Sequence, residues 1–271
     1  RASQQTIDNL ISLHGLDLPL VKQFWNYFSG LLQGNLGISY FQVGKPVWEI
    51  ISSSFFVTLK LTLMAFPVAV TVGITMGLAA AYYKDSWLDR LVSLFIVVAT
   101  SIPQIAIGSF LYILFGLKLQ WLPVAGWGRP AEAVLPVVLI ALWPAASLAK
   151  LSRACILEEF TKQYITTAKA KGLSDFKVFF KHAFVNTLIP ISTNVGLIFA
   201  FLLEGSFITE FLFNIPGLGR VVIDSIYRRD YPVIMASILL ATFIYGLVNL
   251  VVDFGYWFFD PKLRSGEKYN A

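Results

Sequence analysis

Long apolar stretches alternate with short polar segments along the chain. Five stretches contain no Asp, Glu, Lys or Arg, and most of them reach the roughly 20 residues that an α-helix needs to cross a bilayer. These stretches are 61–83, 91–117, 133–149, 183–203 and 231–252. The third is short, but it extends to residue 157 if Lys150 and Arg153 reach toward the headgroups or face the interior of a bundle. The pattern therefore predicts an all-α, polytopic membrane helix bundle with five transmembrane helices.

Small, polar and helix-breaking residues interrupt these stretches. Gly73 and Gly77 in the first stretch would let helices approach closely. Pro103 in the second cannot donate a backbone hydrogen bond, so we expect a kink near mid-membrane, needed either for packing or for lining a pore. Polar side chains within hydrocarbon are costly and commonly face a cavity, although Glu204 lies near enough to the outer boundary to reach water. The candidates for a translocation pathway are Ser101, Gln104, Asn194 and Glu204.

Composition and charge agree with a lipid environment and indicate an orientation. Hydrophobic residues make up 56% of the chain and charged residues 14%, with a mean hydropathy of +0.69. Lys and Arg are denser in 84–90, 150–182 and 260–271 than in 1–54, 118–132 and 204–230. The first group is therefore predicted to be cytoplasmic. Five spans then place residues 1–54 outside the cytoplasm, and because these residues need a preceding helix to carry them across, we expect six helices in the complete protein.

The chain divides into three predicted parts. Residues 1–54 form an extracytoplasmic N-terminal region, in which the aromatic residues of 16–34 are typical of helices near the membrane interface. Residues 55–260 form the transmembrane domain, which includes a cytoplasmic loop at 158–182. Residues 261–271 form a cytoplasmic tail. We interpret the N-terminal region as a folded cap, with substrate docking as the alternative.

Several kinds of chemistry are not supported by the residues present. Cys155 has no second cysteine to pair with, and His14 and His182 are too far apart in sequence to indicate a soft-metal site, so we assign neither catalytic nor metal-binding residues. The phosphate-loop pattern GxxxxGK[S/T] does not occur, so the chain should not bind or hydrolyse ATP itself, and no cofactor is expected in it. Buried acids do not form a series that would relay protons, which makes an ion-coupled secondary transporter the less favoured alternative, alongside an intramembrane enzyme.

The loop at 158–182 is the most informative polar segment. Its pattern predicts two short amphipathic helices joined at Gly172, which can adopt the left-handed conformation that ends a helix. Ser174 is placed to cap the second helix, and Asp175 suits its first turn. Phe176 and its neighbours Phe179 and Phe180 would expose apolar surface beside this corner, which indicates docking to a partner or to the bundle. The alternative is a solvated connector.

Residues 164–174 (YITTAKAKGLS) and 181–190 (KHAFVNTLIP) resemble the cytoplasmic coupling loop of ABC importer permeases, most closely in their peptide/nickel branch. Further matching stretches are 15–20 (GLDLPL), 34–39 (GNLGIS), 210–220 (EFLFNIPGLGR) and 229–233 (RDYPV). The resemblance covers nearly the whole chain. It differs from the broader family at 166–168, where Thr-Thr-Ala stands in place of the frequent Glu-Ala-Ala, which puts any particular salt bridge to an ATPase in doubt.

The resemblance implies a MetI-like permease of the bacterial cytoplasmic (inner) membrane. Its implied partners are a related second permease, two cytoplasmic ATPases that bind ATP and Mg, and an extracytoplasmic substrate-binding protein. The implied cargo is short peptides, with nickel, glutathione, an opine or an oligosaccharide as alternatives. The implied ATPase-coupling positions are Tyr164, Thr167, Ala168, Ala170, Lys171, Gly172, Leu173, Ser174 and Phe176.

Overall fold

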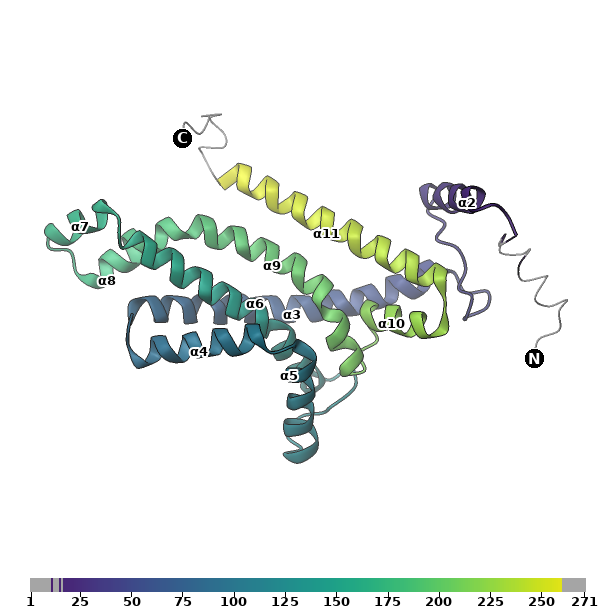
Figure 1. Cartoon of the computed structure of the whole chain (residues 1–271), viewed down its shortest axis with the longest axis horizontal. Helices are drawn as coiled ribbons and strands as arrows, with labels where there is room; N and C mark the ends of the chain where they lie inside the picture. The colour runs from purple at the N-terminus through teal and green to yellow at the C-terminus, as the bar shows by residue number, and fades with distance from the viewer. Residues whose placement is uncertain (1–10, 12–14, 16, 260–271) are drawn as a thin grey trace.

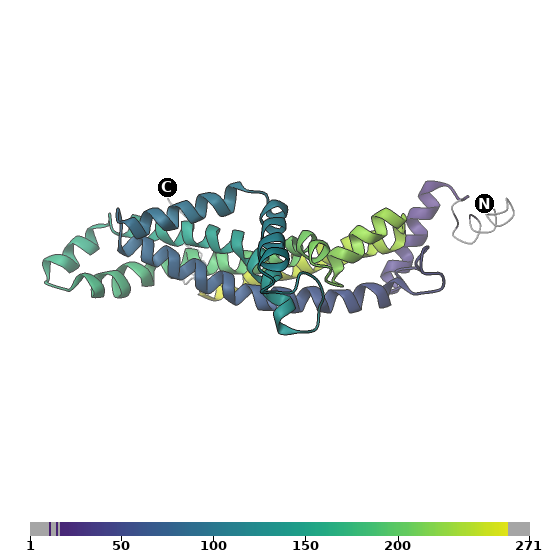
Figure 2. The same cartoon turned by 90° about the horizontal axis from the view of Figure 1, so that it is seen from below.

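The protein is an elongated helical bundle in which the long helices run along its length (Figures 1 and 2). A computed structural model describes residues 11, 15 and 17–259, with the backbone alone described for residues 204, 205, 253 and 255–259. Within that part of the chain there are helices and no strands. The helices are α2 (Leu20–Leu32), α3 (Val47–Tyr82), α4 (Trp87–Ser101), α5 (Gln104–Leu111), α6 (Pro130–Glu159), α7 (Gln163–Ala170), α8 (Asp175–Lys177), α9 (Val185–Leu212), α10 (Leu218–Arg228) and α11 (Tyr231–Phe259), with π-helical segments η1 (Tyr112–Lys118) and η2 (Val178–Phe184).

The predicted membrane spans agree with these helices. Four of the described helices are long and apolar enough to cross a membrane, and the bent pair 87–118 brings the number to five if it counts as one span. The kink expected at Pro103 is confirmed, since α4 and α5 meet there at 106°. Pro103 stands directly before α5, where its missing N–H costs no helical hydrogen bond.

Two boundaries differ from those drawn on the sequence. Helix α3 begins at Val47, well inside the segment 1–54, because its polar first turns still bury Ile50 and Ile51 against Val233 and Ala236 of α11. The second short helix of the loop is not separate, because α8 runs through η2 directly into α9. The loop is therefore a single short helix, α7, followed by the start of a long one.

Close contact between α3 and α6 forms the centre of the bundle. A Cβ atom added to Gly73 would lie 2.8 Å from the carbonyl oxygen of Ala145, and one added to Gly77 would lie 2.6 Å from that of Ala149. The expected role of these glycines in helix approach is thus confirmed. Side chains of α9, including Ile198 and Leu202, complete this core.

Candidate functional site

Residues 158–182, hereafter the coupling segment, lie at one end of the bundle, where α7 projects beyond the long helices (Figure 1). The chain turns at Gly172, whose φ of 77° is the left-handed conformation predicted for it. Two backbone hydrogen bonds close the turn, from Gly172 N to Lys169 O (2.9 Å) and from Leu173 N to Ala168 O (3.4 Å). The C-terminal end of α7 is therefore fixed by this turn, and the helix lies at the surface of the bundle.

The inner face of the coupling segment packs on the bundle. Ile165 and Ala168 of α7 are buried with Ile156 of α6 and with Val178 and Phe179 of η2. Phe179 is only 2% exposed, so the aromatic surface expected from the sequence is partly used within the chain itself. Ala168 is thus an internal contact, which fixes α7 against the long helices.

The outer face of the coupling segment is exposed. Phe176 is 60% exposed, and its ring centroid lies 4.6 Å from that of Phe180. Of the other predicted coupling positions, Tyr164 and Leu173 are half-buried, and the exposed ones are Thr167, Ala170, Lys171, Gly172 and Ser174. Ser174 stands at the start of α8, but its side chain makes no capping hydrogen bond, so that part of the prediction is wrong. An apolar pair beside a fixed corner and several lysines is a surface suited to a protein partner.

Tyr164 connects the coupling segment to both neighbouring long helices. Its hydroxyl donates to Glu159 Oε2 at the end of α6 and accepts from Asn186 Nδ2 of α9 at 2.9 Å. Burial raises the pKa of the Tyr164 phenol, and the hydrogen bond to Glu159 raises it further, so the hydroxyl remains a donor at neutral pH. Lys162 Nζ binds the other oxygen of Glu159 at 2.5 Å. The sequence indicated Tyr164 but gave no sign of its partners.

An ion pair between the partly buried Arg153 and the buried Asp89 secures the turn between α3 and α4 near the same end. Arg153 of α6 makes two hydrogen bonds to the carboxylate of Asp89, of 2.7 and 2.8 Å. The backbone N–H of Asp85 donates to the same carboxylate at 3.0 Å. Arg153 therefore faces the bundle interior, one of the two orientations considered for it on the sequence, and it joins α4 to α6 beside the coupling segment.

The three pathway candidates whose side chains are described do not gather in one place. Gln104 is half-buried at the bend and donates from Nε2 to Thr209 Oγ1 of α9 at 3.1 Å, while Ser101 is exposed on the other side of the bend. Asn194 lies on α9 about 22 Å from Thr209 along the helix axis. Its Oδ1 is buried without a hydrogen-bond partner among the described residues. The side chain of Glu204 lies outside the described part of the chain.

At the opposite end of the bundle, two of the matching sequence stretches meet. The carboxylate of Asp230, which precedes α11, accepts hydrogen bonds from the Ser39 hydroxyl, from Tyr40 N at 3.0 Å and from Phe41 N at 3.4 Å. The guanidinium of Arg228 lies 4.1 Å from the centre of the Phe41 ring. The segment after residue 34 is therefore fastened to the start of α11. The sequence could not indicate this contact, because its partners are 191 residues apart.

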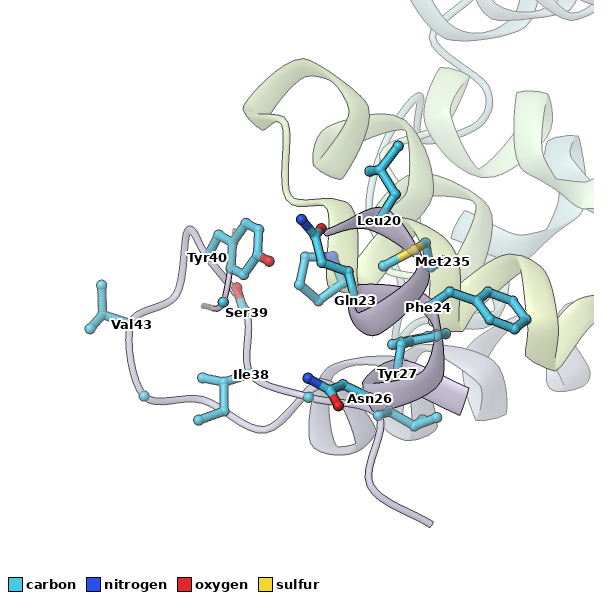
Figure 3. Close-up of a pocket in the computed structure, with 15 residues that line it drawn as sticks. Leu20, Gln23, Phe24, Asn26, Tyr27, Ile38, Ser39, Tyr40, Val43 and Met235 are labelled. Atoms are coloured by element: carbon cyan, nitrogen blue, oxygen red, sulfur yellow. The ribbon is translucent and has the colours of Figure 1, made fainter. Parts of the chain in front are cut away.

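A cavity of about 750 Å³ lies beside this fastening, between α2, the segment 36–44 and the first turn of α11 (Figure 3). The side chains that line it carry no charge. Its polar groups come from Gln23, Asn26, Tyr27, Ser39 and Tyr40, and its apolar groups include Leu20, Phe24, Ile38, Val43 and Met235. Such a lining offers hydrogen bonds and apolar contact to a neutral ligand. Elsewhere in the described residues, His, Cys, Asp and Glu side chains do not form a group of three that could hold a metal ion.

Known proteins resemble the chain over nearly its whole length. The family described as binding-protein-dependent transport system inner membrane component matches residues 73–265. The glutathione transport system permease protein GsiC of Shigella flexneri serotype 5b is 41% identical over 97% of this chain and 86% of its own length. The probable peptide ABC transporter permease protein y4tP of Sinorhizobium fredii is 36% identical over the same shares.

Solved structures share the fold. The inward-facing MetNI methionine ABC transporter has a TM-score of 0.63 at 16% identity, covering 75% of this chain and 93% of that chain. An amino acid ABC transporter has a TM-score of 0.61 at 21% identity, covering 77% and 93%. The helical arrangement described above is therefore that of ABC importer permeases.

Proposed function

Since the chain belongs to the family of binding-protein-dependent transport system inner membrane components, and is thus the multi-pass permease of an ABC importer, we propose that it imports short peptides into the cytoplasm. The observation that carries the mechanism is the coupling segment, which is exposed on its outer face, packs on α6 with its inner face and is hydrogen-bonded to α9 through Tyr164 and Asn186. The names of the relatives support peptide-like cargo. Glutathione, which is itself a tripeptide, is the second candidate because a relative at 41% identity is named for it.

Two cytoplasmic ATPases are the proposed partners of the coupling segment. Phe176 and the exposed positions around Gly172 would enter a groove of one ATPase, while a related second permease would carry the matching segment for the other. ATP and Mg would be bound by those subunits. Burial of the Phe176–Phe180 pair on docking would remove apolar surface from water, which favours association.

The proposed mechanism transmits motion of the ATPases into the bundle. When the ATPases close on ATP, the coupling segment would be displaced as one body, because Gly172 fixes its end and Ile165, Ala168 and Phe179 fix its inner face. Tyr164 would carry the displacement to α6 through Glu159 and to α9 through Asn186. The bundle would thereby alternate between outward and inward openings.

The opposite end of the bundle would face a substrate-binding protein outside the cytoplasm. The density of Lys and Arg in 150–182 supports a cytoplasmic coupling segment. Residues 1–54, the neutral cavity and the Asp230 fastening would then lie on the extracytoplasmic side. The cargo would cross along the interface with the second permease, where Ser101, Gln104, Asn194 and Glu204 remain the proposed pathway residues.

The test compares two glycines with nearly the same backbone. Gly172 (φ 77°) and Gly34 (φ 76°) both have open space where a side chain would be, and each donates a backbone hydrogen bond to the residue three positions earlier. Proline cannot adopt a positive φ or donate that bond. We expect Gly172→Pro to lose co-purification of the ATPases and uptake, while Gly34→Pro at the other end retains the ATPases. If wild-type preparations never contain an ATPase and uptake persists, the proposed mechanism is wrong.

Cargo is tested with the complete transporter and its binding protein in proteoliposomes. Uptake of a radiolabelled dipeptide or tripeptide that depends on ATP supports peptide import. Uptake of glutathione alone would assign the second candidate, and uptake of nickel in the absence of peptide uptake would overturn the peptide proposal.

A further inference from the structure

A continuous helical path runs from the coupling segment to the turn that precedes α10. It begins with α8, passes through η2 and ends with α9 at Leu212, which is a length of about 55 Å (Figure 1). Helix α10 follows after a short turn. Any displacement of the first end therefore reaches the neighbourhood of α10 through one element.

Glu210, close to the far end of this path, is fully buried. Its Oε1 accepts a hydrogen bond from the Thr58 hydroxyl of α3 at 2.7 Å. Its Oε2 accepts from the backbone N–H groups of Gly219 at 2.7 Å and Arg220 at 3.3 Å. Among the described residues, no Lys, Arg or His forms an ion pair with it. Ser206 of α9 also makes a side-chain hydrogen bond to Glu210, so the partners of this carboxylate lie on α3, on its own helix and in the first turn of α10.

These contacts cap α10 from outside the helix. The first N–H groups of a helix have no partner within it, and the residue before α10 is Gly217, which has no side chain to supply one. Thr58 Oγ1 accepts from Leu218 N at 2.8 Å, and Glu210 accepts from the next two N–H groups. A carboxylate also suits the positive end of the helix dipole. The start of α10 is therefore held by side chains of α3 and α9.

The backbone around Glu210 leaves space only for this arrangement. A Cβ atom on Gly217 would lie 2.4 Å from Glu210 Cδ, and one on Gly219 would lie 2.3 Å from Phe207 Cα of α9. A larger residue at Gly219 would push α10 away from α9, and one at Gly217 would displace the Glu210 carboxylate. The close contact thus explains why glycine occupies positions 217 and 219.

We propose that Glu210 is a positioning residue that makes α10 move with α9, so that displacement of the coupling segment reaches the outer end of the bundle. This inference rests on the proposed import function for the origin of the displacement. A buried carboxylate without a cation costs stability relative to an apolar side chain unless its hydrogen bonds are complete. The hydrogen bonds from Thr58, Ser206 and the first turn of α10 account for its place in the core.

The test measures the mobility of α10 and the efficiency of transport in the complete transporter in lipid. A nitroxide label at Tyr227→Cys, a position of α10 that is 79% exposed, reports mobility in a Cys155→Ser background. We expect Glu210→Ala to make the label more mobile and to lower the dipeptide imported per ATP hydrolysed at least tenfold, with ATP hydrolysis retained. Glu210→Gln, which keeps an acceptor oxygen, should lie between Glu210→Ala and wild type.

Asp224→Asn is the matched control, because it neutralises a carboxylate of α10 that pairs with Arg220 of the same helix at 3.4 Å and leaves the cap intact. It should leave mobility and coupling as in wild type. Unchanged label mobility in Glu210→Ala overturns the proposal, and so does increased mobility with unchanged import per ATP.

Two other outcomes can be distinguished from failure of the Glu210 proposal. These are misfolding of the variant and failure of the import function. If Glu210→Ala does not assemble, Thr58→Val decides in its place, since it removes two hydrogen bonds of the cap and leaves Glu210 present. If the wild-type complex contains no ATPase and imports nothing, the proposed function fails. The label in Glu210→Ala then still shows whether Glu210 holds α10.

Discussion

At the scale of single residues, the Tyr164 hydroxyl joins α7 by hydrogen bonds to the end of α6 and to α9, beside the packing of Ile165 and Ala168. Tyr164→Phe removes this hydroxyl and leaves Glu159 and Asn186 each without one partner. We expect the free energy of unfolding to fall by about 1–2 kcal/mol. We also expect the amount of cargo imported per ATP hydrolysed to fall by a larger fraction than the free energy of unfolding does. Thermal unfolding and coupled uptake of the purified complex measure the two effects.

Thr167→Val is the control for the stability measurement. Thr167 is exposed on the same helix, and its hydroxyl bonds only to the Gln163 carbonyl of its own turn. Its loss should leave stability nearly unchanged. Equal coupling ratios in Tyr164→Phe and wild type would show that Tyr164 does not transmit motion.

At the scale of elements, the α3–α6 contact depends on two glycines. A methyl group on Gly77 would lie 2.6 Å from a backbone carbonyl oxygen of α6, which cannot move without separating the helices. We expect Gly77→Ala to destabilise the protein by about 1–3 kcal/mol. Gly246→Ala on α11 meets nothing within 4 Å and should be neutral or stabilising. Unfolding temperatures of the two variants in detergent provide the comparison, and equal values would contradict the packing argument.

Several helices and turns could be predicted from the sequence. Local signals determined the spans, the bend at Pro103 and the corner at Gly172, because each depends on neighbours in sequence or on the bilayer. The sequence placed the start of α3 too late. Glu49 and Lys60 interrupt the apolar pattern, although the first turns of this helix pack on α11. Likewise, Ala168 was assigned to the ATPase surface, whereas burial by η2 could be seen only after folding.

Contacts between residues far apart in the chain could not be predicted from the sequence, for a different reason. The stretches 34–39 and 229–233, and also Thr58 and Glu210, are separated by more than 150 residues, and no periodicity links them. A family resemblance marked three of these places without saying what their side chains do. The structure supplies partners for Ser39, Asp230 and Glu210, and each of them fastens an irregular segment or a helix start.

At the scale of the whole molecule, the two ends of the bundle differ in a way that predicts its orientation. The coupling segment presents lysines and Phe176 at one end, and the segment 36–44 with its neutral cavity lies at the other. A membrane-impermeant maleimide can distinguish them, because Val43 is 93% exposed and the single native cysteine can be removed as Cys155→Ser. In vesicles that carry the chain without its ATPases, Val43→Cys should react when they are right-side-out, whereas Phe176→Cys should react only when they are inside-out.

Tyr227→Cys provides an independent reporter for the outer end, and it should react in the same vesicles as Val43→Cys. The comparison does not require transport activity, so it tests the orientation separately from cargo and partners. Since α8, η2 and α9 run from Phe176 to the turn before α10 as one path, the labels at Phe176→Cys and Tyr227→Cys must appear on opposite sides. Reaction of Phe176→Cys and Tyr227→Cys in the same vesicles would overturn the spanning arrangement. A reversed pattern would place the coupling segment outside the cytoplasm, where no ATPase could reach it.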